Sequence, residues 1–395
     1  MTTSWRGIWA VFAGGLVAGA YMTKVPPTLP ALRGELGLSL IEATFIVTTF
    51  NVLGMLVGMI AGMLGDRFGR RRLSITGLIL MALGGAWGAA VDEFVPLLAS
   101  RFVEGVGFIM FAVPAPALMS AMAGDTRDRA KALGLWSSYM PSGGTIALLL
   151  APWLLVAWSW RALWVVFAAG AALAAVVMAF TVKETPRAQV SSFRLVTESL
   201  AQPGNIAMSV LFACYVAQWT SVMVWLPTFL TEHGASTAGA AVATALMVMV
   251  NVPGNWLGGW LLSRGVPRGR LVIGAAAIAA LCEIGMLPAV LPGDARFVLV
   301  LVFSFSAALM PASIFGGLPV HARSPAHIAT GTGMVQQASN IGQFFGPLVI
   351  ALIASRFGGW EAALWVMLAF AASAAACGVA LGTIEQRLAR SKIPA

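Results

Sequence analysis

Twelve stretches of mostly apolar residues, each about twenty residues long, follow one another along this chain. They cover roughly residues 7–29, 41–63, 73–91, 95–119, 131–156, 162–182, 205–230, 238–263, 271–291, 297–319, 331–356 and 361–384. A helix of about 20 apolar residues is long enough to cross the hydrocarbon core of a bilayer. A membrane β-barrel would instead show alternating segments of about ten residues. The pattern therefore predicts an all-α polytopic membrane protein with twelve transmembrane helices.

Composition excludes the main alternatives to a membrane protein. Hydrophobic residues make up 59% of the chain and charged residues only 10%, so it could not cover a surface that faces water. The three cysteines lie inside apolar stretches and the three histidines lack metal-ligand spacing, so no metal and no cofactor is expected. The chain also lacks a phosphate-binding loop for ATP and a nucleophile with a base, so it is not predicted to be an enzyme.

The net charge of +9 is interpreted through the membrane and not through nucleic acid. With the N-terminus in the cytoplasm, 18 of the 24 lysines and arginines lie in cytoplasmic segments and 4 in external ones. The remaining two, Lys24 and Arg101, lie within spans. Because cytoplasmic loops carry the excess of positive charge, both termini are predicted to be cytoplasmic.

The two halves of the chain resemble each other. The longest hydrophilic stretch, residues 183–204, lies near the midpoint and is predicted to be a cytoplasmic linker. The second and eighth spans are followed by matching residues 197 positions apart: Gly62, Asp66 and Arg67, then Gly259, Ser263 and Arg264. Such a repeat predicts two pseudo-symmetric six-helix bundles, residues 1–182 and 205–395, with a transport site between them.

The loop after the second span has a distinctive sequence. Residues 62–72 read Gly-Met-Leu-Gly-Asp-Arg-Phe-Gly-Arg-Arg-Arg, and Arg101 in the fourth span is followed by Gly105 and Gly107. Both patterns resemble signatures of the major facilitator superfamily, and the resemblance covers the whole chain. Within the superfamily it looks closest to bacterial organic-anion and cyanate-permease-like members. The resemblance implies alternating access to a central cavity lined by helices one, four, seven and ten.

The resemblance gives the loop a gating role, which its spacing supports. The gating residues are Gly62, Asp66, Arg67, Gly69, Arg70 and Arg71. Asp66 stands at a cytoplasmic helix end among arginines, so it can pair with them or with a helix N-terminus in one conformation and release in the other. The alternative is that these arginines only anchor the loop to anionic lipid.

Four ionisable residues fall inside spans, where charges are costly and usually functional: Lys24, Arg101, Glu104 and Glu283. Arg101 and Glu104 are one helical turn apart and are predicted to pair. Burial opposes ionisation of Glu104 while Arg101 favours it, so together they are the predicted proton-coupling residues. The alternative is a purely structural ion pair.

Lys24, one turn after Tyr21, is predicted to join Arg101 in a positive site for a small anion, with snorkelling to the outer interface as the alternative. Glu283 is interpreted as structural or snorkelling.

The second half carries neutral polar residues where the first half carries charges. Predicted substrate-binding residues, in addition to Lys24, Tyr21 and Arg101, are Tyr215, Gln218, Trp225, Gln336 and Asn340. The last two share a helix face with Gln343, and such clustering favours a cavity lining. Polar side chains also bind membrane helices to one another, which is the competing interpretation.

These features together predict a secondary active transporter of the bacterial inner membrane that moves a small anion, by alternating access and proton symport, as a monomer. Its expected partners are the small-molecule substrate, protons and the lipid bilayer, but no nucleic acid. The alternative is a proton-coupled antiporter that exports amphipathic drugs or metabolites. Residues 140–144, Met-Pro-Ser-Gly-Gly, match the antiporter signature only in part, so they leave the direction open. A non-transporting receptor or channel is the rival from another class.

Overall fold

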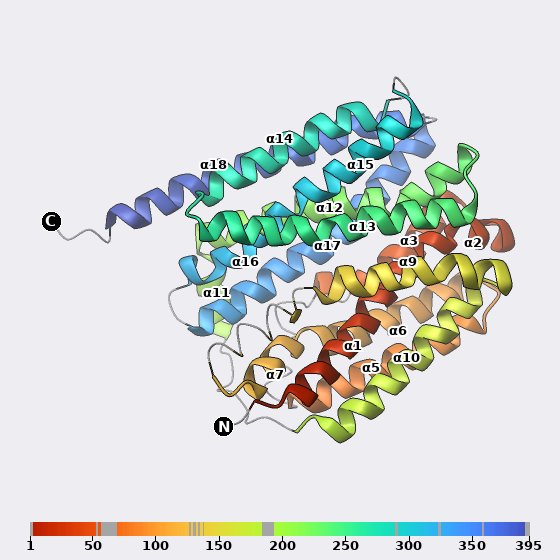
Figure 1. Ribbon diagram of the computed structural model, residues 1–395, viewed down its shortest axis with the longest axis horizontal. Helices are drawn as coiled ribbons and strands as arrows, with labels where there is room; N and C mark the ends of the chain where they lie inside the picture. Colours follow the sequence, from red (N-terminus) through yellow and green to blue (C-terminus); the bar gives the residue numbers. More distant parts are fainter. Residues whose placement is uncertain are drawn as a thin grey trace. The chain divides into compact units, whose positions relative to one another are not determined.

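The computed structural model describes residues 3–52, 54–56, 69–125, 128, 132, 135–136, 138–183, 193–288, 291–322, 325–357 and 359–391. All regular secondary structure in these ranges is helical (Figure 1). Eleven helices in the described ranges are long and apolar enough to cross a membrane, and Leu40–Asn51 is a shorter apolar helix. This shorter helix begins the predicted span 41–63, whose later part, 57–63, lies outside the described residues.

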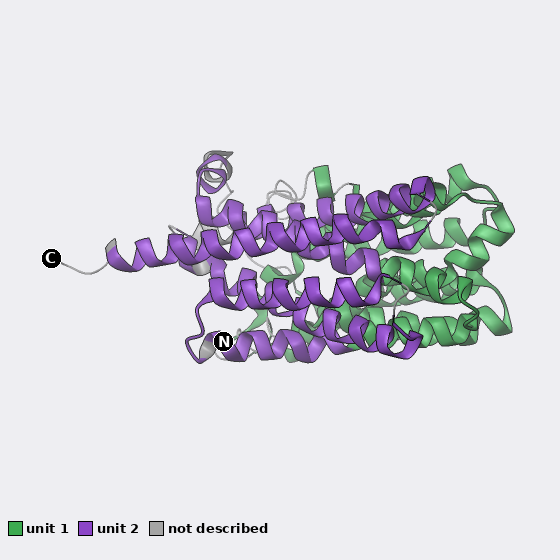
Figure 2. Cartoon of the chain, turned by 90° about the horizontal axis from the view of Figure 1, so that it is seen from above, with its two compact units in different colours: residues 1–191, 223–249 green, residues 192–222, 250–395 purple. Residues whose placement is uncertain are grey.

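The chain divides into two compact units (Figure 2). Unit 1 comprises Met1–Ser191 and Met223–Met249, and unit 2 comprises Ser192–Val222 and Val250–Ala395. The helices before residue 192 are α1 (Trp5–Thr23), η1 (Pro26–Thr28), α2 (Leu29–Leu36), α3 (Leu40–Thr48), η2 (Thr49–Asn51), α5 (Arg70–Ala89), α6 (Phe94–Ala112), α7 (Ala115–Met122), α9 (Tyr139–Ala157) and α10 (Trp160–Thr181).

The remaining helices continue the same pattern. They are α11 (Phe193–Leu200), α12 (Pro203–Glu232), α13 (Thr237–Ser263), α14 (Arg268–Met286), α15 (Gly293–Ala307), α16 (Leu309–His321), α17 (Pro325–Phe357), η3 (Trp360–Ala363) and α18 (Leu364–Ser391). Helix α11 lies within the predicted linker 183–204. The end of α12 and the start of α13, residues 223–249, group with unit 1.

Helix packing in unit 1 depends on small residues. Helix α5 contacts α6 and α10, and α1 contacts α9 and α10. A Cβ on Gly77 of α5 would lie 2.5 Å from the carbonyl oxygen of Gly107 on α6, and a Cβ on Gly107 would lie equally close to the Gly77 oxygen. The two backbones therefore touch at this point, which is how membrane helices gain contact without a hydrophobic driving force between them.

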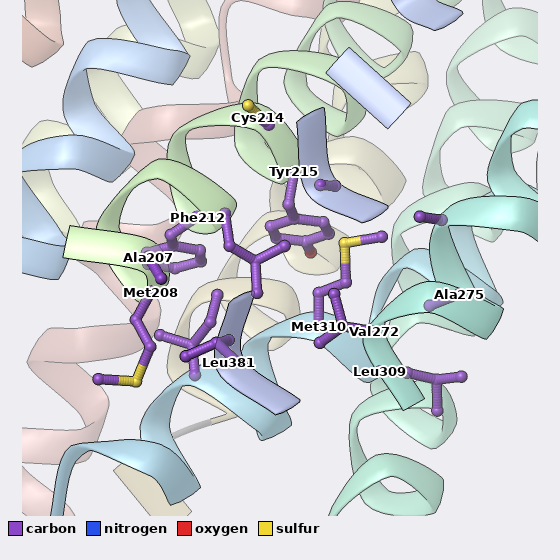
Figure 3. Packing of buried hydrophobic residues seen from close by; sticks show 14 of the residues in the cluster. Ala207, Met208, Phe212, Cys214, Tyr215, Val272, Ala275, Leu309, Met310 and Leu381 are labelled. Carbon is purple, nitrogen blue, oxygen red and sulfur yellow. The ribbon is translucent and has the colours of Figure 1, made fainter. Parts of the chain in front are cut away.

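A buried apolar cluster organises unit 2 (Figure 3). It draws side chains from α12, α14, α16 and α18, among them Met208, Tyr215, Val272, Met310 and Leu381. Residues on one helix recur in the cluster at intervals of three and four, the spacing that places them on one helix face. The cluster fixes α12 against α14, α16 and α18 within this unit.

Candidate substrate and coupling site

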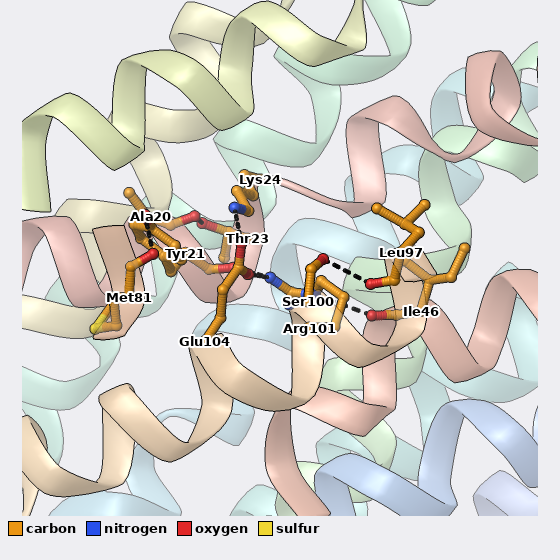
Figure 4. A network of polar contacts seen from close by, with 10 residues as sticks. All are labelled: Ala20, Tyr21, Thr23, Lys24, Ile46, Met81, Leu97, Ser100, Arg101 and Glu104. Atoms are coloured by element: carbon orange, nitrogen blue, oxygen red, sulfur yellow. Dashed lines mark hydrogen bonds and ion pairs between the residues drawn. The ribbon is translucent and has the colours of Figure 1, made fainter. Parts of the chain in front are cut away.

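Two cations and one carboxylate meet inside unit 1 (Figure 4). Lys24 Nζ lies 2.7 Å from Glu104 Oε1, and Arg101 Nη1 binds the other carboxylate oxygen, Oε2. All three side chains are 0% exposed. The formal charge of this buried cluster, in its fully ionised form, is +1.

Local sequence positions each member of the cluster. Lys24 is the C-cap residue that directly follows α1. Pro26 and Pro27 come next and restrict the backbone, so the position of the Lys24 side chain at this helix end is fixed. Arg101 and Glu104 are one turn apart on α6 and share a face. Helix α1 contacts α6, which brings Lys24 to Glu104. The pairing of Arg101 with Glu104 follows from the sequence spacing, whereas the direct contact between Lys24 and Glu104 does not.

Arg101 has further partners beyond the carboxylate. Its Nε donates to the carbonyl oxygen of Ile46 at 3.0 Å, and its Nη1 lies 3.4 Å from the carbonyl oxygen of Tyr21. The guanidinium carbon lies 4.7 Å from the centre of the Phe50 ring. The buried Nη2 has no hydrogen-bond partner among the described residues. Arg101 therefore binds Glu104 through Nη1, while its Nη2 donor group makes no hydrogen bond with the described residues.

Aromatic rings enclose the Lys24 ammonium. Its Nζ lies 4.0 Å from the centre of the Tyr21 ring and 4.4 Å from that of Trp164 on α10. The Tyr21 hydroxyl donates to the carbonyl oxygen of Met81 at 2.7 Å, which orients the ring. Ring faces attract a cation that has lost its water. Because Lys24 is fully buried, the snorkelling alternative for this residue is wrong in this conformation.

The gating loop is described only in part. Gly62, Asp66 and Arg67 lie outside the described residues. Gly69 precedes α5 with a φ of 95°, a conformation that suits glycine. Arg71 donates at 2.6 Å to each of two carbonyl oxygens at the end of α10, those of Ala179 and Val182. Arg70 starts α5.

The second half has an arginine at the equivalent place. Arg268 begins α14, 197 residues after Arg71. It binds Glu385 of α18, and its Nε donates to the carbonyl oxygen of Ser313 at 2.7 Å. The ring Nε2 of His321 lies 3.2 Å from the same Glu385 oxygen. Sequence reasoning did not single out this group, although the 197-residue repeat could have indicated Arg268.

The predicted polar residues of the second half make separate contacts. Gln218 donates from Nε2 to the carbonyl oxygen of Met367 on α18 at 2.8 Å, so it joins two helices. Asn340 donates to the carbonyl oxygen of Gln336 within α17 at 2.8 Å. Trp225 is buried in the part of α12 that groups with unit 1. Gln218 and Asn340 thus donate to different backbone carbonyl oxygens, one on α18 and one on α17.

A neutral network around Tyr215 was not predicted. Asn251 of α13 donates from Nδ2 to the Tyr215 hydroxyl at 3.4 Å and to the Ser304 carbonyl oxygen at 3.1 Å. Asn255 donates to Asn251 Oδ1 at 2.9 Å, and Trp219 Nε1 donates to Ser304 Oγ at 2.9 Å. The i, i+4 spacing of the two asparagines was the available signal.

These observations define the class of protein as a multi-spanning helical membrane protein with charged residues enclosed in its first half. A model of the Major Facilitator Superfamily matches residues 11–336. The chain belongs to the major facilitator superfamily and has its fold, as the sequence resemblance predicted.

Known proteins agree with this membership. The chain is 29% identical over 263 residues to the "Probable 4-methylmuconolactone transporter" of Cupriavidus pinatubonensis, covering 62% of this chain and 59% of that protein. It is 27% identical over 248 residues to the cyanate transport protein CynX of Escherichia coli, covering 62% of this chain and 63% of CynX. A bacterial homologue of the human lysosomal transporter Spinster, crystallised in an inward-facing, unoccupied conformation, has the same fold, with a TM-score of 0.80, 16% identity and full coverage of both chains.

Proposed function

We propose that this transporter imports a small anion together with a proton across the bacterial cytoplasmic membrane. The observation that carries the proposal is the buried cluster of Lys24, Arg101 and Glu104, in which two cations share one carboxylate. A cluster with an excess positive charge is costly in low dielectric and is stabilised when an anion supplies the missing negative charge. The partnerless Nη2 of Arg101 gives such an anion a hydrogen-bond donor.

The cluster also suggests how a proton is coupled to the anion. An anion that binds Arg101 weakens the attraction between Arg101 and Glu104, so Glu104 then accepts a proton more readily. A proton and a monovalent anion taken up together add no net charge, so the loaded cluster keeps the formal charge of +1 that the empty cluster has. A loaded site of this kind can pass through an occluded state without adding uncompensated charge.

The name of one relative supports a small anion as substrate. One is named for cyanate, which is a small anion, and another for 4-methylmuconolactone. We also propose that both termini face the cytoplasm and that the monomer is the functional unit, working by alternating access. A reporter fused after Ala395 should therefore read cytoplasmic, and a periplasmic signal would contradict this orientation.

Transport in proteoliposomes tests the coupling. Glu104→Gln mimics the protonated carboxyl, so it should bind the anion and exchange it across the membrane but should not accumulate it under a pH gradient. Wild-type binding should tighten as pH falls, and binding to Glu104→Gln should depend on pH much less. Cyanate and small carboxylates serve as labelled probes, and a cationic dye tests for export.

The matched control is Glu93→Gln, because Glu93 is an exposed carboxylate that precedes the first residue of the same helix α6. It should accumulate substrate as the wild type does. Normal accumulation by Glu104→Gln under a pH gradient would overturn the coupling role and leave Glu104 as a structural partner of Arg101. Export of the dye driven by protons, without anion uptake, would overturn import and favour the antiporter.

A further inference from the structure

A second carboxyl, that of Glu283, is buried without a hydrogen-bond partner among the described residues. Glu283 lies in the last turn of α14, and its side chain is 0% exposed. Neither of its carboxyl oxygens has a hydrogen-bond partner among the described residues. Glu104 is equally buried, yet both of its oxygens contact cations. The surroundings of the two carboxyl groups are therefore opposite.

The side of α14 that carries Glu283 is apolar and packed. Ala276, Ala279 and Met286 are buried on the same helix face, and α14 contacts α15 and α18. Snorkelling needs the head group to reach water, and a fully buried carboxyl does not. The structural interpretation needs a partner, and the described residues provide none. Neither interpretation of Glu283 from the sequence fits this structure.

The charged residues near the Glu283 end of α14 either hydrogen-bond to backbone carbonyl oxygens or are exposed. Arg296 of α15 donates from Nε to the carbonyl oxygen of Met286 at 2.8 Å and from Nη2 to that of Leu287 at 3.0 Å. Asp294 and Glu361 are exposed and carry negative charge. On α14, Cys282 precedes Glu283 as a neutral thiol.

The charges on the other end of α14 and α18 are distant from Glu283. Arg268, which binds Glu385, is fifteen residues away along α14, or about 22 Å at 1.5 Å per residue. Arg387 and Arg390 follow Glu385 on α18. Neither Glu283 oxygen is hydrogen-bonded to a cation among the described residues.

An ionised carboxylate in this place would be shielded from bulk solvent and would have no hydrogen-bonded counter-ion among the described residues, which strongly disfavours the charged form. A neutral carboxylic acid avoids most of that cost. A metal cation would require several oxygen ligands, and the described residues contain no group of three acidic, histidine or cysteine side chains that could hold one. We propose that Glu283 binds a proton at neutral pH and is a proton-binding site of the second half, separate from Lys24, Arg101 and Glu104.

Infrared spectroscopy of the full-length protein in liposomes tests the proposal directly. The carbonyl stretch of a protonated carboxyl is distinct from that of a carboxylate, so it reports the bound proton without any transport assay. At pH 7 the wild type should show this band, and Glu283→Gln should lose one carboxyl equivalent of it. Glu104→Gln and the exposed control Glu93→Gln should retain the Glu283 contribution. The proposal is thus decided independently of coupling at Glu104.

A second variant tests whether misfolding, and not loss of the carboxyl, removes the band. Glu283→Met is unbranched and apolar, so it suits the apolar surroundings and should fold as stably as the wild type. It should also lose the same band. The proposal fails if the band is the same in the wild type, Glu283→Gln and Glu283→Met, or if added sodium removes it from the wild type.

Discussion

In the first half of this transporter the buried carboxyl of Glu104 contacts two cations. In the second half the buried carboxyl of Glu283 has no hydrogen-bonded cation among the described residues. Glu104 contacts Lys24 and Arg101, whereas Glu283 has no partner among the described residues. Both side chains are fully buried in membrane-spanning helices. The difference teaches that burial alone does not decide what a membrane carboxyl does. The two groups differ in the cations that contact them, and the proposed response to an arriving anion rests on the two cations that contact Glu104.

The same contrast appears in the remaining polar residues of the two halves. Charged side chains lie around Tyr21 in the first half, and asparagine side chains lie around Tyr215 in the second half. If charge binds the substrate, substitutions in the first half should affect binding and those in the second should affect mainly stability. The predictions below separate these outcomes, beginning with the largest effect.

Removing a cation from the buried cluster should have the largest effect. Arg101→Ala and Lys24→Ala should each weaken anion binding at least about 30-fold, since truncating one partner of a buried charge pair costs about 2 kcal/mol or more. Lys24→Arg keeps the charge but changes its shape and hydration, so it should retain partial binding. Binding is measured by calorimetry with the transported anion.

Arg356→Ala is the control for this test, because Arg356 is exposed near the end of α17. It should bind the anion as the wild type does. Unaltered affinity in Lys24→Ala would remove Lys24 from the anion site and leave it as a structural partner of Glu104.

The next effect concerns the gating loop, where the repeat itself supplies a control. Asp66 of the first half corresponds to Ser263 of the second, 197 residues later. Asp66→Asn should lower the transport rate about tenfold, within the usual range of coupling between conformational states, and shift the protein toward the inward-open state. Ser263→Ala should change the rate little. Rates are measured in vesicles after normalising for expression.

Equal rates in Asp66→Asn and the wild type would leave only the lipid-anchor interpretation of the loop. Cysteine accessibility from the cytoplasmic side reports the conformational shift separately from the rate.

The smallest effect compares Arg71, in the first turn of α5, with Arg268, the first residue of α14, which lie 197 residues apart. Arg268 binds a carboxylate, and Arg71 binds backbone carbonyl oxygens. Arg268→Ala should lower the free energy of unfolding by about 2 kcal/mol and Arg71→Ala by about 1 kcal/mol, because removing Arg268 also takes a cationic partner from the partly buried carboxylate of Glu385. Unfolding in detergent by denaturant gives both values. A larger loss in Arg71→Ala would reverse the comparison.

Much of the fold could be predicted from the sequence, because apolar runs and the repeat are properties of chain order. The adjacency of Arg101 and Glu104 was also predictable, since residues three apart share a helix face. The contact of Lys24 with Glu104 was not, because it depends on how α1 packs against α6. That Glu283 has no partner among the described residues could not be predicted either, for a related reason. Helix α14 is apolar on all sides, so periodicity does not distinguish its buried face from its lipid face.

The site residues of the second half were the hardest to predict. Gln218 has the polarity of a ligand-binding residue, yet its amide bonds to a backbone carbonyl on α18. Asn251 and Trp219, which were not predicted, form the hydrogen-bonded network with Ser304. An uncharged side chain in a membrane helix serves packing and recognition with the same chemistry, so residue type alone does not separate the two roles.

The contact between Gly77 and Gly107 has a mechanical consequence for the coupling site. Because the backbones of α5 and α6 touch there, the two helices are closely packed at this point and should move together. Arg101 and Glu104 both lie on α6, so such a movement leaves their backbone separation unchanged. Lys24, at the end of α1, belongs to neither helix. When the cluster opens during transport, the ammonium group should be the part that departs, and the arginine and the carboxyl should remain together.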